Sequence, residues 1–461
     1  MRIFHERLAA FRHRLAGEAH SGLAGVLGRY LPARQRRELR RCGQRKRVFK
    51  PMVTFWNFLA QVLSPGQPCR EAVRQVQASR RRCRQPANAS GTGGYCKARA
   101  RLPEAVLRQT WQAVARQLAM AAPASGRWLG LRVGVVDGTG VSMPDTPDNQ
   151  RAWPQPSGQK RGCGFPAASL LGLFSLATGA VCDLALGTLR HSELALLPQL
   201  WGTLAANFDL LLGDRHFGSF ATFCALRQCG LHGVFRLHQR RTLDWHRGRR
   251  LGRHDRLFVW RRPRQLRWWL PQPAPETITI RVLKILVPVP GFRTTVVFLS
   301  TTLLDHRRFP AEAIAALYRH RWEVELCFRH IKTAMHMEVL RCLDPEMVRR
   351  ELHMHLTAYN LIRTLMFQAA LAHGQDPGRI SFKGTCDALR QWAPHLAATA
   401  AKPALYRHLF RTLLEILAGD LVPLRPDRSE PRAVKRRKKN YQLLTKPRHL
   451  MGNLPHRNHP K

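Results

Sequence analysis

Short apolar runs that alternate with helical segments constrain the fold of this chain more than any other feature. Two of the runs, LRVGVVD (131–137) and FDLLLGD (208–214), each end in an aspartate. Between them, the Thr178–Gly179 pair predicts a hairpin turn joining two buried strands. A helix over residues 192–205 leads into the second run, and a further run, VFRLH, follows it. This order predicts an α/β layer with a mixed sheet.

Asp137 and Asp214 are the acids best placed to bind a ligand. The segment from Leu131 to Arg215 holds seven acids, and only these two end an apolar strand candidate and precede a turn. An α/β sheet places its ligand-binding groups at such strand ends. The other acids are predicted to serve local structure: side-chain turns for Asp145 and Asp148, a helix first turn for Glu193, and strand edges for Asp183 and Asp209.

A further acid, Glu325, lies in a segment that is predicted to form one continuous helix from Pro310 to about residue 332. At about 100° per residue, four side chains fall within roughly 60° of one another: Tyr318, Arg321, Glu325 and Lys332. The carboxylate of such a face can hold a divalent metal, and its cations and phenol can hold phosphate oxygens. The alternative is a solvated face on which Glu325 only pairs with Arg321 or Arg329.

Two strand-end aspartates and a helical glutamate that converge form a site for two divalent cations about 4 Å apart. Oxygen ligands favour Mg²⁺ or Mn²⁺. Zinc prefers His or Cys at short spacing, and the nearest candidates, His353 and His355, do not face each other on a helix. The sequence therefore predicts a two-metal site suited to phosphodiester chemistry.

The charge of the chain indicates a polyanionic partner. Its 76 Lys and Arg against 29 Asp and Glu give a formal charge of +47, and nucleic acid is the favoured partner over a membrane surface. With 44% hydrophobic residues, the chain can still bury a large core, and 461 residues suggest two to four domains. A carboxylate among so many cations is expected to stay ionised at neutral pH.

Cysteine usage and the N-terminal sequence predict a cytoplasmic protein. The 11 cysteines are scattered without a CxxC pair, which argues against a zinc finger or a disulfide framework and for a reducing compartment. The N-terminal sequence MRIFHERLAAFRHRL carries charge throughout, unlike a signal peptide. The uncharged stretch Gly162–Cys182 is long enough for a membrane span, but the hairpin is the preferred interpretation.

Composition and pattern divide the chain into five predicted regions. They are a helical DNA-binding region (1–125), the first part of a catalytic core (126–239), a β-rich insertion with many Arg and Trp residues (240–304), the second part of the core with the Glu325 helix (305–375), and a C-terminal helical region with a basic tail (376–461).

Several separated motifs resemble the catalytic blocks of bacterial DDE transposases of the insertion-sequence-four family. They are DGTGVSMPDTPDNQ with PQPSGQKRGCGFP, then GDRHFGSF, then the Y-R-E-K series that ends at Lys332. The likeness extends upstream to YCKARARLP and downstream to EPRAVKRRKKNYQLLTKPRH, and so covers most of the chain.

This resemblance implies an RNase H-like core with a metal triad of Asp137, Asp214 and Glu325. Tyr318, Arg321 and Lys332 would contact DNA phosphates near the cut, and Thr139 and Arg215 would position the aspartates or the DNA. Family members also stack a flipped base on a Trp of the insertion. The sequence does not choose among four candidates, each of which has insertion core as its alternative role: Trp245, Trp260, Trp268 and Trp269.

The predicted function is metal-dependent cut-and-paste transposition of an insertion sequence by a bacterial, nucleoid-associated enzyme. The protein is expected to bind the inverted ends of its element as a homodimer, nick each end, form a hairpin and join the freed 3′-hydroxyl to double-stranded target DNA. One alternative is a structure-specific nuclease that cuts without strand transfer. Another is a catalytically inactive DNA-binding relative.

Overall fold

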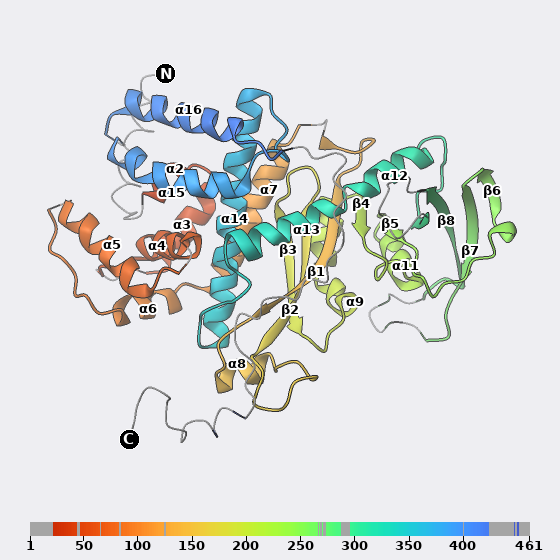
Figure 1. Ribbon diagram of the computed structural model, residues 1–461, viewed down its shortest axis with the longest axis horizontal. Coiled ribbons are helices and arrows are strands. Elements are labelled where there is room, and N and C mark those ends of the chain that lie inside the picture. The colour runs from red at the N-terminus through yellow and green to blue at the C-terminus, as the bar shows by residue number, and fades with distance from the viewer. Residues whose placement is uncertain are drawn as a thin grey trace.

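The core of the computed structural model is one mixed sheet of nine strands, in the order β3-β2-β1-β4-β5-β9-β8-β7-β6 (Figure 1). The structure describes residues 22–43, 47–64, 66–82, 84–123, 126–265, 267, 270, 273–286, 296–399, 401–423, 447 and 450. The strands are β1 (Val133–Ser142), β2 (Ala167–Ser175), β3 (Val181–Thr188), β4 (Leu210–Gly213), β5 (His232–Arg236), β6 (Arg249–Gly252), β7 (Asp255–Arg261), β8 (Thr277–Leu286) and β9 (Val296–Thr301). The predicted mixed α/β class is confirmed.

Helices precede, cover and follow the sheet. Those before it are α2 (Leu23–Leu27), α3 (Ala33–Arg41), α4 (Pro51–Leu63), α5 (Cys69–Arg82), α6 (Gly93–Ala100) and α7 (Glu104–Ala121). Those between strands are α8 (Pro147–Ala152), α9 (Glu193–Leu196), α10 (Trp201–Asn207) and α11 (Phe220–Gln228), with the 3₁₀ turns η2 (Leu197–Leu200) and η3 (Trp245–Arg247). Those after it are α12 (Ala311–Arg319), α13 (Trp322–Arg329), the π-helix η4 (His330–Ala334), α14 (Pro345–His373), α15 (Phe382–Ala398) and α16 (Pro403–Gly419).

Strand β1 joins the antiparallel strands β2 and β3 to the parallel strands β4 and β5. It pairs antiparallel with β2 from Gly134 to Ser142, and parallel with β4 as far as the Val135–Leu212 pair. Strand β4 in turn pairs parallel with β5. Strands β2 and β3 form the predicted hairpin, whose Gly179 has φ +66°, a conformation that glycine adopts without steric cost.

Side chains of β1 alternate between two hydrophobic cores, one on each face of the sheet. Val133 and Val135 belong to the core that contains residues of α12, α13 and α14. Val136 belongs to the other core, which contains residues of α9, η2 and α11. Because a strand alternates with period two, Asp137 faces the α12–α13 side and Gly138 faces the α9 side.

The long helix α14 joins the sheet to the helices that precede it, as Figure 1 shows. Asp344 caps it by accepting the Met347 N–H at 2.8 Å. Deep in the core, the Asn360 side chain accepts the Val181 N–H at 3.0 Å and donates to the Trp111 carbonyl at 3.0 Å. These bonds fix β3 and α7 to one helix. Among the described segments, no helix is long and apolar enough to cross a membrane.

Beyond β5 the sheet continues through β9, β8, β7 and β6, all antiparallel to their neighbours. A buried ion pair organises this extension: the Arg281 guanidinium, with a fully buried side chain, lies 2.5 Å from the Asp255 carboxylate. Arg281 also donates to the carbonyls of Leu303 and Phe309, at 3.1 and 2.7 Å. Strand β8 therefore holds the segment that enters α12.

The predicted continuous helix over residues 310–332 is wrong in detail. It is divided into α12, α13 and the π-helix η4. Between α12 and α13 the bonds tighten to i→i−3, as in Arg321 N–H to the Tyr318 carbonyl at 3.1 Å. After Arg329 they widen to the π pattern. Because the tight turn overwinds the helix and the π turn unwinds it, an ideal α-helical wheel does not describe this face.

Candidate active site

Asp137 does not end a strand, which corrects the sequence prediction. It is the fifth residue of β1, and the strand continues through the Gly- and Thr-rich segment to Ser142 because β2 pairs with it over that whole length. The parallel neighbour β4, however, ends at Gly213, directly before Asp214. Asp137 therefore lies beside the carboxyl end of β4, so the two aspartates still share one edge of the parallel part of the sheet.

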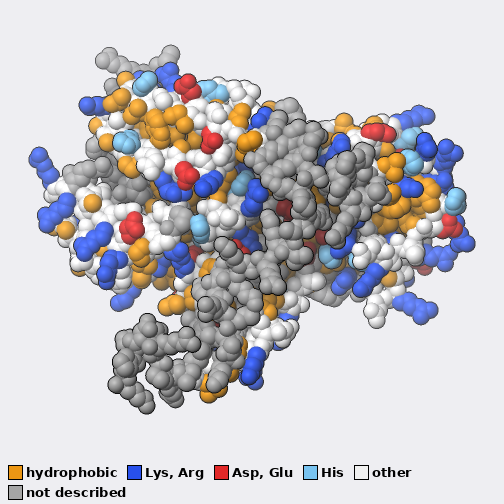
Figure 2. Space-filling view, viewed as in Figure 1, with side chains coloured by type: hydrophobic (Ala, Val, Ile, Leu, Met, Phe, Trp, Pro, Cys, Tyr) orange, Lys and Arg blue, Asp and Glu red, His pale blue; other side chains and the backbone are white. Residues whose placement is uncertain are grey.

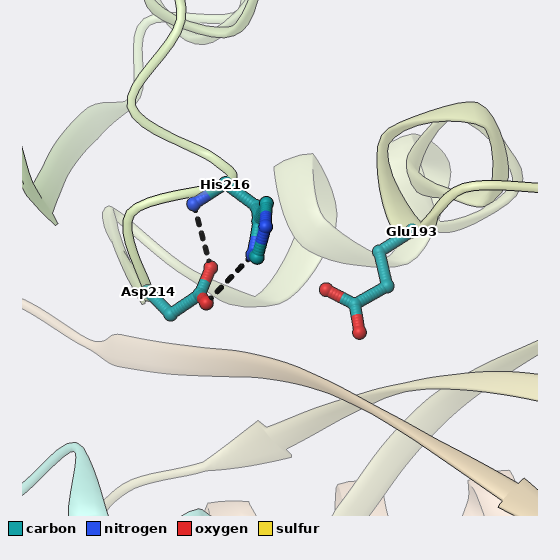
Figure 3. A group of neighbouring side chains, drawn as sticks. All are labelled: Glu193, Asp214 and His216. Atoms are coloured by element: carbon teal, nitrogen blue, oxygen red, sulfur yellow. Dashed lines mark hydrogen bonds and ion pairs between the residues drawn. The ribbon is translucent and has the colours of Figure 1, made fainter. Parts of the chain in front are cut away.

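Asp214 is held by the residue two positions later. Its carboxylate accepts the His216 backbone N–H at 2.8 Å and contacts the His216 Nδ1 at 2.9 Å. Figure 3 shows both contacts, and it shows the carboxylate of Glu193 reaching from α9 toward the same place. One ligand atom each from Glu193, Asp214 and His216 can be chosen so that all lie within 4.8 Å of one another.

The sequence assigned Glu193 to the first turn of a helix, and it does begin α9. The structure adds that it lies beside Asp214, which sequence reasoning missed. Burial, followed by the charge of Asp214, raises the pKa of Glu193. The sequence held no signal for this neighbourhood, because a helix first turn accounts for an acid at this position.

On the other side of β1, helix α13 carries Glu325. The Arg321 guanidinium pairs with this carboxylate at 2.9 Å, which is the contact of the local-pairing alternative. Arg321 has a nearly buried side chain, 10% exposed, whereas Glu325 is 43% exposed. Although burial opposes the Arg321 cation, Tyr318, Glu325 and Asp137 together raise its pKa. Arg321 thus lies within electrostatic reach of both acids.

Lys332 and Tyr318 also lie toward the site. From the π-helix, Lys332 Nζ donates to Thr139 Oγ1 at 3.1 Å, and Thr139 is two residues beyond Asp137 on the same face of β1. Burial raises the pKa of Tyr318 to about 12, while Arg321 lowers it and Asp214 raises it. Packing fixes this helix over the sheet, since Phe328 meets Phe174 of β2 at a centroid distance of 4.9 Å.

The pKa of Asp137 is raised to about 6, mainly by burial and also by the carboxylates of Glu193 and Glu325. A hydrogen bond from the Gly138 N–H and the charge of Arg321 oppose the shift. The pKa of Asp137 is therefore raised in spite of the Arg-rich chain, because water is partly excluded and two carboxylates lie close by; at about 6 it still leaves the carboxylate mostly ionised at pH 7. Such a crowd of carboxylates fits a site that binds divalent cations.

The predicted triad is only partly assembled. Asp214 meets Glu193 and His216, Glu325 meets Arg321, and Asp137 lies within electrostatic reach of both groups. Within the described ranges, no three acids or histidines other than Glu193, Asp214 and His216 bring their ligand atoms within 4.8 Å. His353 instead accepts a hydrogen bond from Trp111 at 3.1 Å and lies 3.5 Å from Glu104, which is a structural role.

Arginines surround the Asp214 side of the site. A cavity of about 580 Å³ opens there, lined among others by Arg215, His216, His238, Arg240 and Arg241. Arg215, a predicted DNA contact, is half-buried and donates to the Gln239 side chain at 2.8 Å. The cavity thus offers cations and ring N–H groups directly beside the carboxylates.

Two of the four candidate tryptophans can be placed. Trp245 is half-buried against Phe258 and Phe298, and Trp260 is buried beneath the Arg241 guanidinium at 3.8 Å. Both pack inside the sheet extension, in agreement with the core alternative. Trp268 and Trp269 lie outside the described residues.

Basic side chains gather toward both ends of one face of the molecule. Figure 2 shows Lys and Arg over α5 and α6 at one end and over β6 and β7 at the other. Exposed members are Arg70, Arg74, Arg81, Lys97, Arg249, Arg250 and Arg261. The basic C-terminal run EPRAVKRRKKN lies outside the described residues.

The chain matches the family model described as "Transposase DDE domain" over residues 128–361, which span β1 to α14 and include every acid of the site. The chain belongs to the DDE transposases. It is similar to the transposase InsG of insertion sequence element IS4 from Escherichia coli (strain K12), with 29% identity over 87% of this chain and 89% of that relative. These matches confirm the resemblance to the insertion-sequence-four family, and the protein is a DNA transposase.

Two shorter sequence similarities agree with this assignment. The Escherichia coli transposase for insertion sequence element IS421 is 36% identical over 14% of this chain and 17% of its own length. The putative transposase y4zB of Sinorhizobium fredii is 38% identical over 17% of this chain and 23% of its own. A solved piggyBac transposase synaptic complex with hairpin DNA covers 91% of this chain and 88% of its own at 9% identity, with a TM-score of 0.42. The family assignment does not depend on that last likeness.

Proposed function

We propose that this transposase cuts its element out of DNA and pastes it elsewhere, with Asp137, Asp214 and Glu325 as its catalytic acids. The observation that carries the proposal is the meeting of three elements: β1 with Asp137, the end of β4 with Asp214, and α13 with Glu325 on the Asp137 side of the sheet. The DDE domain match covers all three.

The strand order supports an RNase H-like core. Antiparallel β1, β2 and β3 followed by parallel β4 and β5, in the order β3-β2-β1-β4-β5, form one half of the sheet. We assign residues 126–239 and 305–375 to this core and residues 240–304 to a β-rich insertion. Residues 1–125 would form a DNA-binding region, and residues 376–461 a helical region with a basic tail.

DDE transposases use divalent metal ions, and the donor set here fits them. We propose two Mg²⁺ or Mn²⁺ ions, held by Asp137, Asp214 and Glu325, because carboxylate oxygens suit hard cations. When bound, these ions polarise the scissile phosphate and lower the pKa of the attacking water. Glu325 would exchange its contact with Arg321 for a metal, which frees the guanidinium for a phosphate.

The remaining residues of the site act on DNA. Arg321, Lys332 and Tyr318 lie on the Asp137 side and would hold phosphate oxygens around the cut, while Arg215 would hold the strand at the basic cavity. A water oxygen attacks phosphorus, the bond to the 3′ oxygen breaks, and that oxygen takes up a proton. The freed 3′-hydroxyl then attacks a phosphorus of the opposite strand, which displaces the 3′ oxygen of the flanking DNA and gives a hairpin. A second water opens the hairpin at the same phosphorus and regenerates the 3′-hydroxyl. This hydroxyl finally attacks a phosphorus of the target and displaces a 3′ oxygen of the target strand, which takes up the proton.

The partners proposed from this chemistry are the inverted ends of the element and target double-stranded DNA. Cleavage at two ends suggests a homodimer in the synaptic complex. The place of action would be the bacterial cytoplasm, at the nucleoid. The charge of +47 supports a DNA partner.

The test is an in vitro reaction with linear DNA that carries the inverted repeats flanking the gene, a target plasmid and Mg²⁺. Denaturing gels are expected to show nicked ends, hairpins and plasmid-joined products, all absent with EDTA. Cleaved ends without any joined product would favour the structure-specific nuclease. Binding with no cleavage in either metal would favour the inactive relative.

A further inference from the structure

The Glu193 carboxylate has an unusual environment for an acid of this protein. Two other partly buried acids have a basic partner: Asp209 pairs with Arg132 at 2.8 Å, and Glu104 pairs with Arg349 at 3.0 Å. Glu193 is half-buried, yet its side chain makes no hydrogen bond or salt bridge with any part of the chain that the structure describes. In a chain with 76 Lys and Arg, a half-buried carboxylate without a cationic partner requires an explanation.

The neighbour that Glu193 does face is another acid. Its carboxylate and that of Asp214 lie within 4.8 Å, together with His216, and Figure 3 shows the two carboxylates directed toward each other. Two facing carboxylates repel each other unless a cation lies between them. His216 already contacts Asp214, so it leaves Glu193 without a direct partner.

Strand β1 is shaped to receive Glu193. A Cβ on Gly138 would overlap the Glu193 Oε1 atom, and it would also crowd the Cδ and Cγ atoms. The carboxylate therefore occupies the space that a side chain at position 138 would fill, one residue after Asp137. Only glycine at this position permits the approach.

Taken with the proposed function, on which this inference rests, we propose that Glu193 is a fourth carboxylate ligand of the divalent cations and shares one cation with Asp214. It reaches the site from the α9 side of β1, whereas Glu325 reaches it from the α13 side. An oxygen donor in this position suits Mg²⁺ or Mn²⁺. His216 would orient Asp214 without binding the metal.

Mn²⁺ binding to the full-length protein without DNA tests this directly, by counting free Mn²⁺ with electron paramagnetic resonance. Glu193→Gln is expected to weaken binding at one site at least tenfold. The matched control is Glu323→Gln, an exposed acid on α13 that contacts His320, and it is expected to bind Mn²⁺ like the wild type. Thermal unfolding in EDTA checks folding, and Glu193→Gln is expected to melt no lower than wild type because one of two facing charges is gone.

Two further variants separate this inference from the proposed function. Gly138→Ala leaves the carboxylate in the chain but displaces it, and should weaken Mn²⁺ binding in the same way. Wild-type Mn²⁺ affinity in both Glu193→Gln and Gly138→Ala would overturn the inference. In that case, loss of Mn²⁺ binding in Asp214→Asn would leave the proposed function standing without Glu193. Wild-type Mn²⁺ binding in Asp214→Asn would show that the proposed metal site itself is wrong.

Discussion

At the scale of single residues, the site depends on a few charges that are partly removed from water. Arg321 is the cation that connects them, since it pairs with Glu325 and its charge lowers the pKa of Asp137, against the larger effect of burial. Lys332, in the π-helix η4 that follows α13, donates a hydrogen bond to Thr139 on β1. In the proposed mechanism, both cations hold a phosphate beside the carboxylates.

Replacing Arg321 or Lys332 by Ala should slow cleavage much more than it weakens DNA binding, because many other basic residues share the binding. A hydrogen bond to a charged group contributes about 1.5–3 kcal/mol. Losing one should therefore slow the step by about one to two powers of ten. Single-turnover cleavage of a labelled element end measures the effect. Arg329→Ala, an exposed cation of α13, is the control; wild-type rates in both test variants would mean that the shared face has no catalytic role.

At the scale of elements, the position of the catalytic helix depends on contacts outside the site. The ion pair of Arg281 with Asp255 holds the segment before α12, and the packing of Phe328 on Phe174 holds α13. The tight turn between α12 and α13 overwinds the helix, and the π-helix η4 unwinds it. Together they keep Tyr318, Arg321 and Lys332 near one site although the helix is not regular. Substitutions that remove these contacts should lower the free energy of unfolding.

Asp255→Ala should destabilise the protein by about 3–5 kcal/mol, because it leaves the Arg281 guanidinium buried without its counterion. Urea unfolding of the full-length chain measures the change. Asp244→Ala removes a carboxylate whose partner Arg247 is exposed, and it should change stability very little. Equal effects from the two substitutions would contradict the structural role given to the buried pair.

The contact between α7 and α14 should make stability depend on acid pH. Hydrogen bonds from His353 and Arg349 lower the pKa of Glu104 from 4.5 to about 2, against the effect of burial. Because the folded pKa is depressed, this contribution is present above about pH 4.5 and is lost as pH falls toward 2. Thermal melts across this range should show a smaller decrease for Glu104→Gln than for wild type. Parallel curves for the two proteins would show that the pair does not contribute.

At the scale of the whole molecule, basic side chains lie toward both ends of one face (Figure 2). The exposed cations of α5 and α6 and those of β6 and β7 are far apart along the molecule (Figure 2). A duplex that touched both ends would neutralise many phosphates at once. Basic side chains at these two places on the surface therefore account for part of the charge of +47.

DNA affinity should consequently fall steeply with salt, with a slope in log K of about 0.9 for each phosphate neutralised. Fluorescence anisotropy with a labelled element end, at several salt concentrations, gives this slope. Arg249→Ala with Arg250→Ala should reduce the slope if β6 touches DNA. An affinity that stayed flat between low and physiological salt would contradict the polyanion argument.

The sequence predicted the parts of the fold that follow from local pattern. The hairpin at Thr178–Gly179 was recognisable from apolar spacing and turn residues. The full length of β1 was not, because its second half is rich in Gly and Thr and is a strand only through its pairing with β2. The sequence also did not predict that the helix is interrupted after Arg319, because contacts with the rest of the fold set the helical winding at that point.

The sequence pattern pointed to Asp137, Asp214 and Glu325 as candidate acids, but not to Glu193. Its local position explained it fully as a helix first-turn acid, so nothing in the pattern called for a second role. The approach of its carboxylate to Asp214 and Gly138 depends on how α9 packs against β1, which is a property of the folded chain.

The central claim is that Asp137, Asp214 and Glu325 are the catalytic acids, and single-turnover cleavage by three alanine variants tests it most directly. Each of the variants should lose detectable cleavage in Mg²⁺ while binding DNA with nearly wild-type affinity, because each loses a metal ligand and no phosphate contact. A variant that cleaves at a near wild-type rate would contradict the assignment of that residue.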